Sequence, residues 1–86
     1  MIVELSRVAA KFLKRLNQPD LGHIIAALDG LENEPPMGDI AHLSGQVGHF
    51  RLRVGKYRIL FVYKDERIYV TYIDLRGQVY KKGGKK

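Results

Sequence analysis

Cysteine is absent from the 86 residues, so the chain can form neither a disulfide framework nor a thiolate metal site. Long apolar runs are also missing, and no segment approaches the ~18 consecutive apolar residues that a membrane-spanning helix needs. The start of the chain, Met-Ile-Val-Glu-Leu, carries an acidic residue and no basic one, unlike a secretory signal peptide. These absences predict a cytoplasmic protein with no membrane partner.

The charge of the chain is unevenly distributed. Its formal net charge is +6. Residues 48–86 contain eleven Lys or Arg and three Asp or Glu, whereas residues 1–47 contain four and six. A basic half of this kind favours an anionic partner, such as nucleic acid or an acidic protein segment. It contains no basic amphipathic helix, which argues against an anionic membrane surface.

The first half of the chain has the pattern of a strand followed by two helices. Residues 2–5 are short and β-rich, and Ser6 is placed to cap a helix over residues 7–16. A second amphipathic helix is expected over residues 20–31. Because the loop between the helices is short, they are expected to form an antiparallel hairpin. Prolines and a glycine over residues 35–38 end this helical part.

The second half of the chain centres on a β-hairpin over residues 48–63. Apolar and basic residues alternate along its first strand with the period of two that a strand requires. Gly55 and Lys56 give its only turn signal, and a glycine that opens a two-residue loop suits a type II′ turn. That turn sets the register of the two strands and puts Arg53 opposite Arg58.

This register predicts two chemically different faces of the hairpin. One face is apolar and is expected to pack under the helices. The other carries Arg51, Arg53 and Arg58 and is expected to be open and concave. Two arginines directly opposite each other repel, so the arrangement favours a site for an anion such as phosphate, whose geometry the guanidinium fork matches. The alternative is a basic surface that is simply exposed to solvent.

A second turn at Asp65 and Glu66 is expected to lead into a strand over residues 67–74. If the loop at Asp65 and Glu66 has two residues, Val62 lies opposite Tyr69 and Arg58 opposite Ile73, and the arginine face becomes apolar at its other end. This apolar area is expected to consist of Leu60, Val62, Tyr69 and Ile73.

The elements together predict an α+β fold. An N-terminal strand and a two-helix hairpin are expected to pack on one face of a mainly antiparallel sheet of four to five strands. Residues 1–82 are expected to form a single domain, and residues 83–86 a disordered basic tail. The three histidines share no metal-ligand spacing with one another or with a carboxylate pair, so no metal site is expected.

This order of elements, together with FRLRVGKYRI over residues 50–59 and IDLRGQVY over residues 73–80, resembles the RelE/ParE superfamily of bacterial and archaeal toxins. The resemblance covers nearly the whole chain. It implies the toxin of a type II toxin–antitoxin module, and a ribosome-dependent endoribonuclease. Such an enzyme cuts messenger RNA in the ribosomal A site by attack of a ribose 2′-hydroxyl, with no metal or cofactor. The alternatives are a ParE-like inhibitor of DNA gyrase, or an inactive RelE homologue that acts only through antitoxin binding and transcriptional co-repression.

The resemblance also implies roles for single residues. Arg51 and Arg53 match the two basic residues of the family's second strand and would hold phosphates. Arg58 would stabilise the charge that develops on the scissile phosphate, and Arg76 would act similarly. Tyr80 matches the terminal tyrosine, which would stack on a base or transfer a proton. These five residues form the expected catalytic set.

Further contacts and partners follow from the same resemblance. The expected RNA-binding residues are Arg51, Arg53, Lys56, Lys81 and Lys82. A RelB-like antitoxin is expected on the apolar area, and the ribosome with its messenger and ribosomal RNA at the basic face. Operator DNA is expected to be bound only through the antitoxin complex. The general base stays open between Tyr80 and His49, because arginine holds its proton too tightly, and His49 can equally be a solvent-exposed residue at the strand entry.

Overall fold

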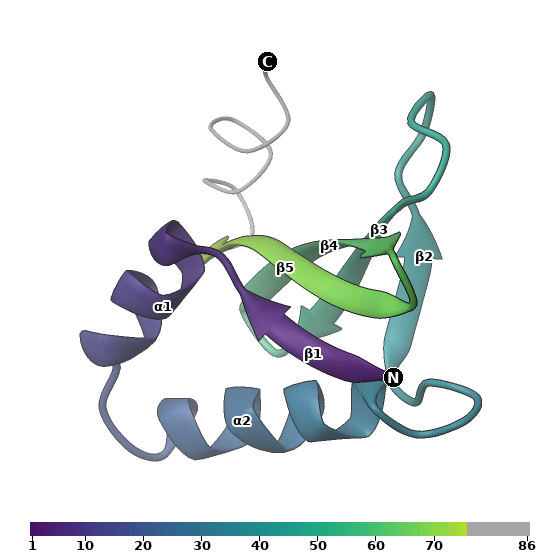
Figure 1. Cartoon of the computed structure of the whole chain (residues 1–86). Helices are drawn as coiled ribbons and strands as arrows, with labels where there is room; N and C mark the ends of the chain where they lie inside the picture. The colour runs from purple at the N-terminus through teal and green to yellow at the C-terminus, as the bar shows by residue number, and fades with distance from the viewer. Residues whose placement is uncertain (76–86) are drawn as a thin grey trace.

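The computed structural model describes residues 1–75, which form one five-stranded sheet with two helices (Figure 1). In chain order the elements are β1 (Ile2–Leu5), α1 (Arg7–Lys14), α2 (Asp20–Leu31), β2 (Asp39–His42), β3 (His49–Val54), β4 (Tyr57–Lys64) and β5 (Arg67–Leu75). The strand order across the sheet is β1-β5-β4-β3-β2. β1 runs parallel to β5, and the other neighbours are antiparallel. The expected α+β fold is therefore confirmed.

Ser6 caps the N-terminus of α1, as its position before the amphipathic segment predicts. Its hydroxyl oxygen accepts a hydrogen bond of 3.0 Å from the Ala9 backbone N–H, one of the donors that a helix start leaves without an intrahelical partner. The same hydroxyl donates a bond of 2.9 Å to the carbonyl oxygen of Thr71 on β5. One side chain thus fixes the first helix to a strand at the far end of the chain.

Both helices pack on the sheet. α1 contacts β5 and β1, and α2 contacts β1 and β3. Figure 1 shows their axes at a wide angle rather than side by side, so the expected antiparallel packing of the two helices on each other is wrong. Each helix packs on the sheet instead. The apolar sheet face beneath them supplies most of the core, as the hairpin register predicts. The sheet residues of this core are Leu52, Tyr57, Ile59, Phe61, Ile68, Val70 and Ile73.

The hairpin register follows the prediction residue by residue. Val54 pairs with Tyr57, and Arg53 pairs with Arg58. Gly55 has a φ of +57°, which a type II′ turn requires at its first loop position and which glycine adopts without a Cβ clash. The turn sequence therefore determines which side chains reach each face of the sheet.

β2 is an edge strand that the sequence pattern does not reveal. It pairs with β3, so that Asp39 lies opposite Arg53 and Ala41 lies opposite Arg51. The strand is four residues long and contains only one large apolar side chain, Ile40, which packs against the core. So short a segment with an Asp and a His lacks the repeated alternation that marks a longer strand.

β5 carries a bulge that uninterrupted alternation does not predict. Leu60 and Phe61 are consecutive on β4, but their partners on β5, Tyr72 and Val70, are two residues apart. Thr71 is the extra residue between them, and its hydroxyl donates a hydrogen bond of 3.2 Å to the Leu60 carbonyl. An added residue of this kind exchanges the faces of all side chains that follow it on the strand.

The bulge corrects the expected position of Ile73. This residue pairs with Ile59 rather than with Arg58, and it is 1% exposed within the core. Its placement on the arginine face was therefore wrong, because Thr71 shifts the parity of the strand. Asp74 takes the place opposite Arg58 instead.

Within residues 1–75, no helix is long and apolar enough to cross a membrane. The expected tail over residues 83–86, and with it the end of the domain at residue 82, lies outside the described residues.

Candidate functional site

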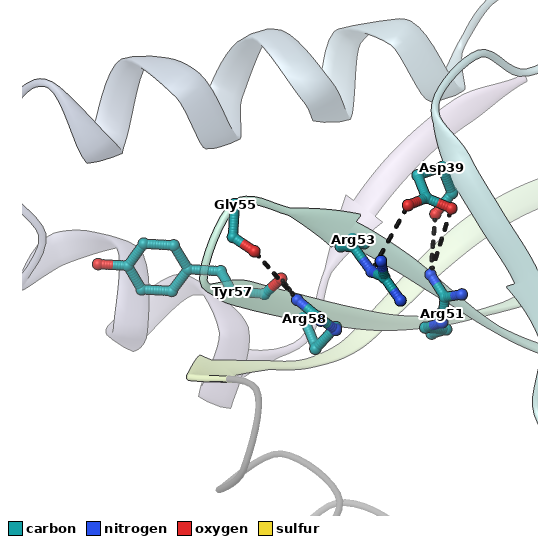
Figure 2. A network of polar contacts seen from close by, with 6 residues as sticks. All are labelled: Asp39, Arg51, Arg53, Gly55, Tyr57 and Arg58. Atoms are coloured by element: carbon teal, nitrogen blue, oxygen red, sulfur yellow. Dashed lines mark hydrogen bonds and ion pairs between the residues drawn. The ribbon is translucent and has the colours of Figure 1, made fainter.

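The hairpin brings together three arginines on the sheet face that the helices leave uncovered. Arg51 and Arg53 come from β3, and Arg58 comes from β4 directly opposite Arg53. Figure 2 shows the three side chains along the hairpin. Three guanidinium groups this close repel one another, so the fold must supply anionic or carbonyl partners for them.

An acidic residue of β2 provides part of that compensation. The Asp39 carboxylate lies with one oxygen 3.5 Å from Arg51 Nη1 and the other 3.5 Å from Arg53 Nε (Figure 2). Arg51 Nη1 also donates a hydrogen bond of 3.2 Å to the Asp39 backbone carbonyl. Sequence reasoning did not find Asp39, because the strand that carries it was not predicted.

Arg58 is buried, with an exposed fraction of 5%, which corrects the expectation that all three arginines lie on an open face. Its Nη1 donates hydrogen bonds of 3.1 Å to the Gly55 carbonyl and 2.9 Å to the Tyr57 carbonyl. These bonds to the turn and the adjacent strand residue hold the guanidinium in one orientation. Arg53 is half exposed and can reach a ligand in solution.

Lys56, expected among the RNA-binding residues, lies in the hairpin turn beside α2. Its Nζ is 3.7 Å from the Asp20 carboxylate, which also accepts a 2.6 Å hydrogen bond from the Tyr57 hydroxyl. That bond, aided by the positive charge of Lys56, lowers the pKa of Asp20. The same hydrogen bond to Asp20, together with burial, raises the pKa of Tyr57.

The expected apolar area is only partly at the surface. Val62 is half-buried and Tyr69 is 37% exposed, and the two residues pair across β4 and β5. Leu60 lies on the arginine face but is 4% exposed, and Ile73 is in the core. Ile2 of β1 is also exposed, but it pairs with Arg67. The β1 residue beside Tyr69 is Glu4, which forms an ion pair with Arg67, so the apolar surface ends at Tyr69.

Arg76, Tyr80, Lys81 and Lys82 lie outside the described residues, so their placement relative to the arginines stays a prediction. His49 is exposed, and its Nδ1 is 3.1 Å from the Val47 carbonyl. No group of three or more His, Asp or Glu side chains within residues 1–75 could hold a metal ion.

Fold and site together define a small α+β protein with an arginine cluster on the free face of a mixed sheet. Comparison with known proteins extends this description. Residues 3–80 match the model of the ParE toxin family, toxins of type II toxin–antitoxin systems. The chain therefore belongs to this family, within the RelE/ParE toxin superfamily, as the sequence resemblance predicts. It is a type II toxin–antitoxin toxin.

Solved structures of related toxins share the fold. The RelE–RelB complex of Pyrococcus horikoshii matches with 26% identity and a TM-score of 0.73, over 90% of this chain and 96% of that chain. The RelB–RelE complex of Methanococcus jannaschii matches with 21% identity and a TM-score of 0.74, over 90% and 94%. RelBE2 of Mycobacterium tuberculosis matches with 24% identity and a TM-score of 0.71, over 87% and 96%. No curated protein sequence matches the chain.

Proposed function

We propose that this toxin is a metal-independent endoribonuclease that cuts messenger RNA in the A site of the ribosome. The observation that carries the proposal is the convergence of Arg51, Arg53 and Arg58 on the sheet face left free by the helices. In the reaction, a ribose 2′-oxygen loses its proton and attacks the adjacent phosphate. The bond to the 5′-oxygen breaks and that oxygen gains a proton, which leaves a cyclic phosphate and a 5′-hydroxyl.

In this proposal the roles of the three arginines differ with the exposure of their side chains. Arg53, half exposed, and Arg51 beside it contact the phosphate oxygens from β3. Arg58 is held by backbone carbonyls and contributes fixed positive charge, the kind of preorganised stabilisation that a developing phosphorane charge requires. Arg76 completes the set in this proposal, Tyr80 serves as stacking or proton-transfer group, and Lys56, Lys81 and Lys82 attract the RNA backbone.

Induced expression followed by primer extension on a translated messenger tests the proposal. Wild type is expected to arrest growth and to leave cuts at A-site codons. Arg53→Ala is expected to lower cleavage about 10²–10³-fold, the usual effect of losing one transition-state contact. Arg15→Ala is the matched control, because Arg15 is an exposed arginine at the end of α1. Arrest without cuts contradicts the nuclease proposal.

Inhibition of DNA gyrase is the second candidate, and the match to the ParE family model favours it. The ion pairs of Asp39 also favour it, because they reduce the net positive charge that an RNA phosphate would meet. A supercoiling assay with purified gyrase separates the two functions. Loss of supercoiling, without cuts in ribosome-bound messenger, selects gyrase. Failure of both assays, with no growth arrest, selects an inactive homologue that serves only in co-repression.

We also propose that a RelB-like antitoxin binds this toxin in the cytoplasm. Complexes of RelE-type toxins with RelB support the proposal. On this chain the half-buried Val62 and the exposed Tyr69, which pair across β4 and β5, suit the apolar side of an amphipathic segment, and the neighbouring arginines suit its acidic residues. Operator DNA is then contacted through the antitoxin.

Co-expression with the product of the neighbouring gene tests this proposed partner. A complex is expected to raise the melting temperature of the toxin by mass action. Tyr69→Glu is expected to weaken the complex, whereas Lys11→Glu, an exposed change on α1, leaves it intact. A toxin that forms no stable complex contradicts the proposed partner.

A further inference from the structure

The Asp39 carboxylate lies against both arginines of β3 at once. Its two oxygens are each 3.5 Å from a different guanidinium nitrogen, on Arg51 and on Arg53. Figure 2 shows the carboxylate beside the pair. A phosphate group that engages both arginines would place its oxygens in the same way, since carboxylate and phosphate bind guanidinium with similar geometry. Asp39 therefore occupies the position of a ligand anion.

The ion pairs of the Asp39 carboxylate are weak, whereas Arg51 beside it makes a second interaction. The Asp39 side chain is 54% exposed, and separations of 3.5 Å are longer than a charge-assisted hydrogen bond. Exposed ion pairs of this kind are weak and easily exchanged for other partners. Arg51 also donates a hydrogen bond of 3.2 Å to the Asp39 backbone carbonyl, a contact that does not depend on the position of the Asp39 side chain.

We propose that Asp39 competes with the substrate from within the protein. Its carboxylate occupies the phosphate position between Arg51 and Arg53 until an RNA phosphate displaces it. This inference rests on the proposed nuclease function and names a residue that sets its RNA affinity. The competition weakens binding to free RNA. It favours RNA that is held at high effective concentration next to the toxin, as on a ribosome.

Asp39→Asn tests the competition, because it removes the charge and keeps the shape and the backbone carbonyl. The probe is a single-stranded RNA of about twelve nucleotides, within the range of site sizes for such RNA. Its binding is followed by fluorescence anisotropy at several salt concentrations. Asp39→Asn is expected to tighten binding about three- to tenfold. The slope of log K against log salt is expected to steepen by about 0.7, the value for one further phosphate contact on a single strand.

Asp29→Asn is the matched control for net charge. Asp29 is exposed on α2, in the layer on the other face of the sheet. It changes the overall charge by the same amount but is expected to leave RNA affinity nearly unchanged. In an Arg51→Ala/Arg53→Ala background, Asp39→Asn is also expected to have no effect. Thermal melting of each variant verifies the fold.

Equal affinity of wild type and Asp39→Asn, or weaker binding by the variant, overturns the inference. So does an equal gain from Asp29→Asn, because the effect is then one of net charge. These outcomes are independent of messenger cleavage. A toxin that cuts messenger but shows no Asp39 effect keeps the proposed function and loses the competitor. Tighter binding by Asp39→Asn, in a toxin that cuts nothing, leaves the competitor and removes the nuclease.

Discussion

The Tyr57 hydroxyl donates a 2.6 Å hydrogen bond to the Asp20 carboxylate and thereby ties the start of α2 to the arginine hairpin. Tyr57 itself is buried. Replacing it with Phe keeps the ring and leaves the carboxylate without this donor, so Tyr57→Phe is expected to lower the melting temperature by several degrees. Tyr63→Phe is the control, because no hydrogen bond of the Tyr63 hydroxyl occurs within residues 1–75. Equal melting temperatures for Tyr57→Phe and wild type contradict the prediction.

The same pair predicts a pH dependence of stability. Folding lowers the pKa of Asp20 below its ordinary value of 3.8, so this contribution is complete above that pH and is lost as the pH falls through the folded pKa. Folding raises the pKa of Tyr57 above 10.0, so its contribution is complete below that pH and is lost as the pH rises. Melting curves should show the largest difference between wild type and Tyr57→Phe between these two limits. A difference that does not change with pH contradicts the assignment.

Ser6 should contribute to stability at two places at once. Ser6→Ala removes the cap of α1 and the donor to the Thr71 carbonyl in the bulge. The expected loss is about 1–2 kcal/mol in the free energy of unfolding, measured by urea denaturation. Ser44→Ala, in an exposed turn, should change stability little. A Ser6 variant as stable as the Ser44 variant contradicts the double role.

A substitution in the turn between β4 and β5 should increase the stability of the protein. Asp65 and Glu66 have φ values of +53° and +62°, as a type I′ turn requires, although neither residue is glycine. Glu66→Gly is expected to raise the free energy of unfolding by about 0.5–1 kcal/mol, because it removes the Cβ clash of the left-handed conformation. Glu66→Ala removes the charge but keeps the Cβ, and no gain is expected from it. A similar gain from both variants points to charge rather than backbone strain.

Arg58 and Arg53 should differ in how much each side chain contributes to the free energy of unfolding. Arg58 is buried with two backbone carbonyl acceptors, so Arg58→Ala is expected to cost about 2 kcal/mol of stability or more. Arg53 is half exposed, and Arg53→Ala should cost less than about 1 kcal/mol. Urea denaturation of the two variants measures the difference. Equal costs mean that burial does not distinguish their roles.

The pairing of β3 with β4 was predictable from the sequence, because one turn residue sets the register of both strands. Gly55 determines a two-residue loop, and the loop determines that Arg53 faces Arg58. The position of Arg58 on the strand was predictable in this way. Its burial was not, because burial depends on what the rest of the fold places around the side chain.

Neither the bulge in β5 nor the strand β2 was predicted from the sequence, and the physical reasons differ. The core takes Ile68, Val70 and then Ile73, a spacing of two followed by three, and this break in alternation is the one signal of the bulge. β2 gives no comparable signal, since it is held mainly by its ladder with β3. Asp39 was missed with it. The two acidic residues that the register places opposite the arginines, Asp39 opposite Arg53 and Asp74 opposite Arg58, both depend on these long-range features.

β1 lies in parallel beside β5, so the first strand of the chain has its partner at residues 67–70. Ser6, which caps the neighbouring α1, also donates a hydrogen bond to the Thr71 carbonyl. A growing polypeptide thus has no partner strand for β1 until residues 67–70 have been synthesised, and such distant closures slow folding. Docking of β1 on the sheet therefore comes after synthesis of the hairpin. A nascent chain that stops before residue 67 presents a hairpin without the strand that joins it to β1.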